Sequence, residues 1–200
     1  MTFEHFVALQ LFAAIAAYTP GPNNALLMAS GVNFGFRRSL PLVFGVAFGF
    51  PLMIWLVGLG LGRVFETYIA LYIALKYAGA AYMLYLAWKI ATSQPSGGGA
   101  TTEAKPLSFL QMALFQWINP KGWIMAITGL SAYTSASSYY TGVAVVVATF
   151  VFMGLTSAIA WALFGAGLAR LMSDPRYFRI INIGLAVLLV ASLVPMLMTN

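Results

Sequence analysis

Long apolar runs alternate with short polar segments along almost the whole chain of 200 residues. The first two runs, residues 5–36 and 39–62, contain no Asp, Glu, Lys or Arg. About 20 apolar residues cross the hydrocarbon core of a bilayer as a helix, so each run is long enough to span a membrane. Four further runs follow, at about residues 67–90, 107–132, 140–168 and 177–198. The pattern predicts an all-α, polytopic membrane protein with about six transmembrane helices.

Composition supports lipid as the solvent of these helices. Hydrophobic residues are 62% of the chain and charged residues only 7%, whereas a soluble domain carries about 25% charged residues. The N-terminus lacks a positive n-region, and the first run is too long for a signal peptide, so we expect it to stay as the first span. There is no cysteine, which excludes disulfides, thiolate metal sites and thiol redox chemistry.

Positive charge is distributed unequally between the two sides that this layout defines. The loops after the first, third and fifth spans hold Arg37, Arg38, Lys89, Lys105, Arg170, Arg176 and Arg179. Arg63 alone lies on the other side. Because cytoplasmic loops are enriched in Lys and Arg, we expect the first set of loops to be cytoplasmic and both termini to be periplasmic.

Two of the six runs contain residues that break helices. The motifs are Thr19, Pro20, Gly21, Pro22, Asn23 and Asn24 in the first run, and Asn119, Pro120, Lys121 and Gly122 in the fourth. Each proline removes a backbone donor and clashes with the preceding turn. Unsatisfied backbone groups are tolerated in a membrane only inside protein or along a wet cavity. The alternative is that the breaks are two simple kinks, with their freed backbone groups capped by the asparagines. The sequence leaves this structural explanation open.

The positions of the breaks suggest a repeat. Pro20 and Pro120 are half the chain apart, and a polar, glycine-rich segment lies between them. We expect three domains: a first three-helix repeat at 1–92, a cytoplasmic linker at 93–106, and a second three-helix repeat at 107–200. An odd number of spans per repeat inverts the second one, a plan that recurs in transporters with discontinuous helices. This inference rests on the positions of the breaks and of the linker, because the amino-acid sequences of the two halves do not match.

Broken helices offer groups that suit a zwitterion. The N-terminal end of a half-helix carries partial positive charge and free N–H groups, which suit a carboxylate. The exposed carbonyls at the C-terminal end of the other half-helix suit an ammonium group. Lys121 is an ionisable residue at mid-membrane depth, which is costly and typical of function. It is expected either to pair with a substrate carboxylate or to become neutral, and the structural alternative is that it snorkels or hydrogen-bonds the opened backbone of the first break. Lys76 is a second such residue, and it is expected to reach the outer interface or to serve a role that the sequence does not define.

The broken motifs resemble a known family. The run Thr19–Asn23 and the run Asn119–Lys121 are similar to the signatures of LysE/RhtB amino-acid exporters, and the likeness covers the whole chain. Three stretches, Tyr77–Tyr82, Leu86–Ala91 and Ala104–Phe109, resemble the cysteine/O-acetylserine branch. The sequence departs from the family at Trp123–Gly129, where many members have a Phe-rich run ending in Pro-Gln, and at Phe50-Pro51, which predicts a third kink.

The resemblance implies a secondary transporter in the bacterial inner membrane, with no cofactor. It would export a small neutral amino acid, of the cysteine/O-acetylserine or threonine/homoserine type, and would be driven by the proton gradient. In this interpretation Asn23, Asn24 and Asn119 hydrogen-bond the substrate and Lys121 binds its carboxylate. The expected partners are that amino acid and the lipid bilayer, with a homodimer left open.

Other classes of function fit less well. His5 is the only histidine and lies at an outer edge, so no Ser/His/Asp triad is available, and no acidic metal cluster is present. We therefore expect neither an enzyme nor a metal site. Nucleic-acid binding is not expected, because no basic stripe with interleaved aromatic residues accompanies the net charge of +6. A passive channel or a membrane scaffold is the alternative to a transporter.

Overall fold

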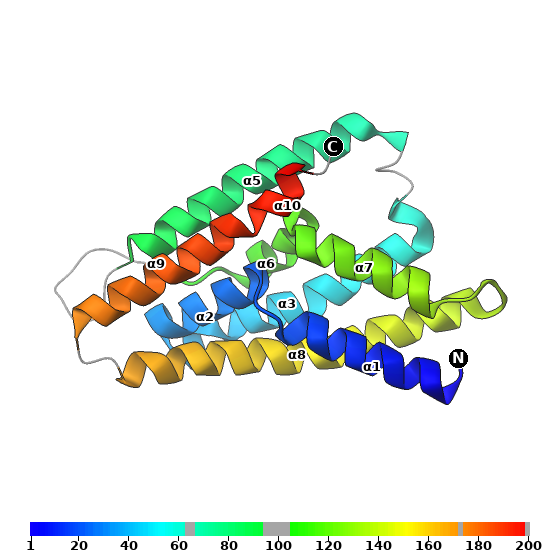
Figure 1. The fold of residues 1–200 in the computed structure, drawn as a ribbon, viewed down its shortest axis with the longest axis horizontal. Helices are drawn as coiled ribbons and strands as arrows, with labels where there is room; N and C mark the ends of the chain where they lie inside the picture. The colour runs from blue at the N-terminus through cyan, green and yellow to red at the C-terminus, as the bar shows by residue number, and fades with distance from the viewer. Residues whose placement is uncertain (63–66, 94–104, 172–173, 199–200) are drawn as a thin grey trace.

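A computed structural model describes residues 1–62, 67–93, 105–171 and 174–198, and all regular secondary structure in these ranges is helical (Figure 1). The helices are α1 (Phe3–Tyr18), α2 (Pro22–Phe34), α3 (Phe36–Leu56), η1 (Val57–Leu61), α5 (Ile69–Ala91), α6 (Phe109–Phe115), η2 (Gln116–Ile118), α7 (Pro120–Tyr133), η3 (Ala136–Ser138), α8 (Tyr139–Leu171), α9 (Pro175–Ala191) and α10 (Leu193–Met198). Most of the predicted linker, and Arg63, lie outside the described residues.

The long helices are arranged around the two broken ones. In Figure 1, α8 lies along one side, α5 and α9 run side by side along the other, and α6 and α7 lie between them. Helix α8 contacts α2 and α3, α9 contacts α5 and α2, and α6 packs on α3. The buried apolar residues form two clusters, one around α2, α5, α6 and α9 and one around α1, α7 and the first half of α8.

Small residues allow helices to approach closely. A Cβ at Gly45 would lie 2.7 Å from the Phe109 carbonyl oxygen, and one at Gly49 would lie 2.6 Å from the Ala113 Cα, so these glycines let α3 meet α6. Their spacing of four residues is the small-xxx-small pattern that is typical of close helix packing in membranes. A second close contact was not predicted: a Cβ at Gly31 or Gly165 would collide with the backbone of the facing helix, α8 or α2.

Among the described residues, two helices are long and apolar enough to cross a membrane: Phe36–Leu61, with 26 residues, and Ala136–Arg170, with 35. The apolar helices Phe3–Tyr18 and Phe109–Ile118 are shorter, because the first and fourth apolar runs are each divided by a break, as the sequence predicts. That the chain crosses the membrane six times, and that its halves form an inverted repeat, stay predictions.

The third kink, expected at Phe50-Pro51, stays a prediction. Pro51 lies inside α3 without ending it, and so does Pro41. The irregularity follows at η1, a π-helical turn in which Gly60 has a φ of 106°, a backbone conformation that favours glycine. This irregular turn directly follows α3, and it contains Gly60, a glycine that the sequence analysis did not single out.

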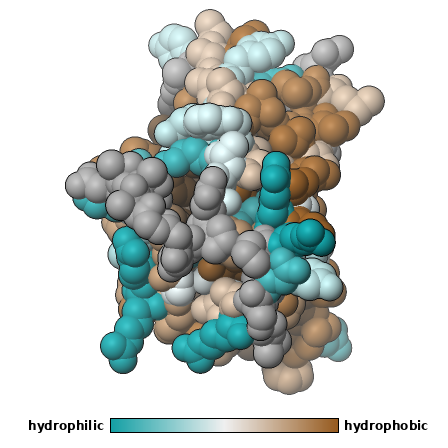
Figure 2. All heavy atoms as spheres, turned by 90° about the vertical axis from the view of Figure 1, so that its left-hand side faces the viewer, coloured by the Kyte–Doolittle hydropathy of each residue, from teal (hydrophilic) through white to brown (hydrophobic). Residues whose placement is uncertain are grey.

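The surface has one polar end and apolar sides. Figure 2 looks onto the left end of Figure 1, where α2, α5 and α8 end, and hydrophilic side chains gather around it. The helix turns that begin or end here contain Arg37, Arg38, Lys89, Arg170 and Arg176, and we call this the basic end. Large apolar side chains are exposed along the sides, among them Phe44, Phe48, Trp55, Ile124, Phe152, Phe164, Ile180 and Val187. Such a surface suits lipid.

Candidate functional site

The first break separates α1 from α2. Helix α1 ends at Tyr18, Thr19 and Gly21 are extended, and α2 begins at Pro22. Proline is well suited to the first helical position, because the N–H that it lacks would have no partner there. Since neither Pro20 nor Pro22 has an N–H, the carbonyls of the preceding turn lose their usual donors. The Thr19 hydroxyl donates back to the Ile15 carbonyl at 2.5 Å, so this side chain points away from the gap.

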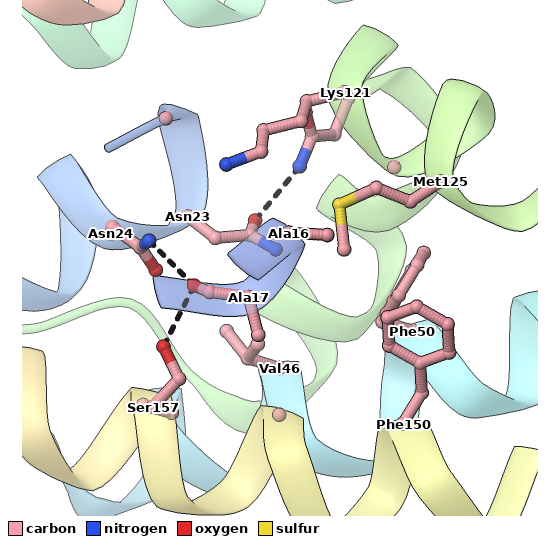
Figure 3. A pocket seen from close by; sticks show the side chains of 15 residues that line it. Ala16, Ala17, Asn23, Asn24, Val46, Phe50, Lys121, Met125, Phe150 and Ser157 are labelled. Carbon is pink, nitrogen blue, oxygen red and sulfur yellow. Dashed lines mark hydrogen bonds between the residues drawn. The ribbon is translucent and has the colours of Figure 1, made fainter. Parts of the chain in front are cut away.

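Side chains from other parts of the chain bind the exposed carbonyls of the first break. The Asn24 Nδ2 donates to the Ala17 oxygen at 2.9 Å and to the Thr19 oxygen at 2.8 Å. Ser157 of α8 donates to the same Ala17 oxygen at 2.8 Å, so that one carbonyl joins α1, α2 and α8 (Figure 3). The break is therefore held open by hydrogen bonds to specific side chains.

The second break is shorter and closes largely on itself. Helix α6 tightens into η2, Asn119 is extended, and α7 begins at Pro120. The Asn119 N–H donates to the Gln116 carbonyl at 3.3 Å. The Trp123 indole Nε1 donates to the Trp117 carbonyl at 2.8 Å. Both bonds stay within the segment around the break.

The two breaks meet in space. The Lys121 Nζ, in the first turn of α7, donates to the Thr19 carbonyl at 2.6 Å and lies 3.5 Å from the Pro20 carbonyl. The Asn23 Nδ2 donates to the Gln116 Oε1 at 2.9 Å, and the Asn119 Nδ2 donates to the Asn23 Oδ1 at 3.1 Å. Residues about a hundred positions apart in sequence thus form one polar cluster, and Lys121 hydrogen-bonds the opened backbone of the first break.

A small cavity lies beside this cluster, with a volume of about 40 Å³. Its polar lining comes from Asn23, Asn24, Asn119, Lys121 and Ser157, and its apolar lining includes Val46, Phe50, Met125 and Phe150 (Figure 3). This volume holds water molecules and is too small for an amino acid. Binding a larger molecule therefore requires that some of the hydrogen bonds around the cavity break.

Two features of the cavity wall matter for chemistry. Gly21 leaves room for the lysine, because a Cβ there would lie 2.7 Å from the Lys121 Cδ and 3.3 Å from its Nζ. The Asn119 Oδ1 is buried and accepts no hydrogen bond from the described residues. The site thus combines an ammonium group, backbone carbonyls and an acceptor without a donor.

The residues singled out from the sequence play different parts here. Asn23, Asn24, Asn119, Lys121 and Gly21 line the cavity. Thr19 and Pro20 are exposed and contribute carbonyl oxygens to Lys121, while Pro22 and Pro120 begin helices. Whether these residues bind a substrate stays a prediction.

Sequence reasoning missed two members of the polar cluster, Gln116 and Ser157. Gln116 is fully buried between Asn23 and the Met112 carbonyl, and Ser157 is almost as buried. Each is a polar residue within an apolar run, which is the signal that would have found it. In the part of the chain that the structure describes, no group of three His, Cys, Asp or Glu side chains could hold a metal ion.

Comparison with known proteins gives a consistent result. Residues 14–196 match the family described as LysE type translocator. The cysteine/O-acetylserine efflux proteins of Escherichia coli (strain K12) and Shigella sonnei (strain Ss046) are each 37% identical to the chain over 195 residues, 95% of this chain and 96% of theirs. The protein of the same name from Shigella flexneri is 37% identical over 188 residues, 92% of each chain. No solved structure matches the chain.

Proposed function

The chain belongs to the LysE type translocator family, and from this premise we propose that it exports a small neutral amino acid across the bacterial inner membrane. The relatives named as cysteine/O-acetylserine efflux proteins favour that pair of substrates over threonine and homoserine. The step is secondary transport, driven by the proton gradient, and involves no chemical reaction of the substrate. The observation that carries the proposal is the contact of the Lys121 ammonium group with the carbonyls of the first break.

That contact suggests how a zwitterion binds. In the structure the Lys121 ammonium group occupies the position that suits the ammonium group of an amino acid, next to the Thr19 and Pro20 carbonyls. We propose an exchange: the substrate ammonium group takes these carbonyls, and the released Lys121 pairs with the substrate carboxylate. A charged donor is replaced by another charged donor, so no carbonyl is left without a partner. The exchange also enlarges the cavity.

The three asparagines have different roles in this proposal. Both donor positions of the Asn24 amide are used by the Ala17 and Thr19 carbonyls, so Asn24 holds the shape of the break. The Asn119 Oδ1, which is buried and accepts no hydrogen bond from the residues described, is available to the substrate ammonium group. Asn23 joins Gln116 and Asn119, so it transmits a change at one break to the other.

The proposal includes a membrane topology. Six crossings form two inverted repeats, 1–92 and 107–200, with the basic end in the cytoplasm, the linker 93–106 on that side, and both termini in the periplasm. Support comes from the pairing of α3 with α8 and of α5 with α9, which are the helices that an inverted repeat would relate. The gathering of hydrophilic side chains at the basic end agrees with the positive-inside rule. A homodimer is left open.

Counterflow in proteoliposomes tests the function. Vesicles loaded with unlabelled O-acetylserine, cysteine, threonine or homoserine are diluted into a trace of the labelled amino acid, at two pH values. A carrier gives transient, saturable accumulation with at least one of them, and lysine gives little, because the described cavity has no acidic side chain. Linear, non-saturable equilibration would identify a channel. No movement of any of these amino acids would contradict the proposal.

A further inference from the structure

A second polar contact lies at the other end of α2. The Asn33 Nδ2, in the last turn of this helix, donates to the Asn182 Oδ1 of α9 at 2.8 Å and to the Ala29 carbonyl at 2.7 Å. Asn182 is fully buried, and its Nδ2 donates to no acceptor among the described residues. We call Asn33 and Asn182 the asparagine pair.

The asparagine pair lies between the cavity and the basic end. Helix α2 begins at the cavity with Asn23 and reaches Asn33 ten residues later, which is roughly 15 Å at the usual rise per residue. Arg37 follows four residues after Asn33, and Arg179 precedes Asn182 by three. A solute moving between the cavity and the basic end along α2 would therefore pass this pair.

The contacts of α2 are of two kinds. On one side α2 is fixed: Gly31 and Gly165 bring its backbone against that of α8, and Ser30 hydrogen-bonds Ser39 of α3 at 2.7 Å. Close backbone packing of this kind resists sliding. On the other side α2 meets α9, which packs on α5, and the asparagine pair is the hydrogen bond between them. The structure can thus open between α2 and α9 more readily than between α2 and α8.

The unused donor suggests what the pair does when it is open. A buried amide N–H without an acceptor costs free energy, so an asparagine at this place is a poor choice for packing alone. The buried apolar cluster through which α2, α8 and α9 pack contains several small residues: Ala25, Ala29, Ala158, Ala162 and Ala186. Small side chains leave little to displace when a solute passes, and the amide is the polar group that it would meet.

We propose that the asparagine pair is a gate and a second substrate station on the path between the cavity and the basic end. Paired, the two amides close the path. Parted, the Asn182 amide donates to the carboxylate of the amino acid on its way to the cavity. This inference rests on the proposed transport function, and it assigns the opening movement to α5 and α9 together, away from α2, α3 and α8.

Cross-linking tests the gate, because the natural chain has no cysteine. The double variant Asn33→Cys/Asn182→Cys is joined with a short bis-methanethiosulfonate reagent, and counterflow of O-acetylserine is measured, since cysteine as substrate would reduce the bridge. The matched control is Ser30→Cys/Ser39→Cys, which bridges α2 to its fixed neighbour α3 at a similar distance. Bridging the first pair is expected to lower transport at least tenfold, reversibly by reduction, and bridging the control pair to leave it within about twofold. Full transport by the completely bridged first pair would overturn the proposal.

A second measurement does not depend on transport. Ala158 lines the cavity, and in an Ala158→Cys protein the rate of modification by an impermeant thiol reagent from the basic end reports opening. Adding Asn33→Ala and Asn182→Ala removes the closing hydrogen bond, and the rate should rise roughly threefold to tenfold, as expected for one such bond in a membrane protein. An unchanged rate would argue against a gate at this pair. If no amino acid is transported by the unmodified protein, the proposed function fails while this rate still decides the gate.

Discussion

The two breaks are built from similar residues but are stabilised in opposite ways. The first leaves the carbonyls of Ala17, Thr19 and Pro20 exposed, and side chains of α2, α7 and α8 bind them. The second is closed by Trp123 and by the backbone of its own segment. One break depends on distant parts of the chain for its hydrogen bonds, and the other depends mainly on itself.

This difference assigns complementary parts to the two breaks. The first supplies acceptors, and the second supplies donors that point toward them, Lys121 and Asn119. Local hydrogen bonds keep the second break in shape when its side chains change partners. The first break loses a partner whenever Lys121 moves. We therefore expect the first break to rearrange on substrate binding, and the second to stay as it is.

The largest effect is expected from Lys121→Ala, which removes the link between the breaks. The substrate carboxylate loses its partner, and the Thr19 and Pro20 carbonyls lose a charged donor. A hydrogen bond to a charged group contributes roughly 1.5–3 kcal/mol, so initial rates of counterflow should fall roughly 10- to 150-fold. The measurement is counterflow of O-acetylserine at matched amounts of reconstituted protein.

Two variants control for charge and for folding. Lys89→Ala removes a lysine at the end of α5, where the ammonium group lies 5.6 Å from the centre of the Tyr85 ring, and should transport within about twofold of the natural protein. Lys121→Arg keeps the charge in a bulkier form and should retain part of the activity. Export at the natural rate by Lys121→Ala combined with Asn119→Ala would refute the site.

A substitution at Gly21 tests the same contact from the first break. An added Cβ would lie 2.7 Å from the Lys121 Cδ, so the lysine must move away from the Thr19 carbonyl. Gly21 is extended, a backbone conformation open to any residue, so Gly21→Ala should fold normally. We expect roughly a tenfold loss of counterflow at an unchanged melting temperature.

Gly122→Ala is the corresponding change in the second break, and it should lower counterflow less than Gly21→Ala does. A Cβ at Gly122 would meet nothing closer than the Gln116 carbonyl oxygen at 3.5 Å, which is ordinary contact. Gly167→Ala on α8, where a Cβ meets nothing within 4 Å, is the control for adding a methyl group to this protein. Equal losses from Gly21→Ala and Gly122→Ala would show that the two breaks do not differ in the way proposed.

The sequence predicts the breaks well because their cause is local. Pro20, Pro22 and Pro120 lack the N–H that would continue a helix, and α2 and α7 begin at Pro22 and Pro120 as expected. Pro41 and Pro51, which stand alone in their turns, lie inside α3 without ending it. One of the alternatives for Lys121, hydrogen bonding to the opened backbone, is confirmed by its contact with the Thr19 carbonyl.

The parts that sequence reasoning missed depend on contacts between distant segments. The partner of Asn23 is Gln116, and the partner of Asn33 is Asn182, 149 positions away. A periodic apolar pattern shows that a helix is buried but does not show which neighbour it faces. For the same reason Gly31 and Gly165 were not recognised as a contact, since they face each other's helices only once α2 lies along α8.

The smallest expected effect concerns stability rather than transport, and it distinguishes the second break from the first. Trp123→Phe keeps an aromatic ring beside Trp117 but removes the indole donor to the Trp117 carbonyl. A hydrogen bond of this kind contributes about 0.6–1.7 kcal/mol in a membrane protein, so the melting temperature in detergent should fall by about 1–7 °C. Counterflow should stay within about threefold of the natural protein, because Lys121 and Asn119 keep their positions.

Asn24→Ala is the matched change in the first break, and it should lower both the melting temperature and counterflow, since two carbonyls lose their donor at once. If Trp123→Phe abolishes transport while Asn24→Ala spares it, the second break is the one that rearranges.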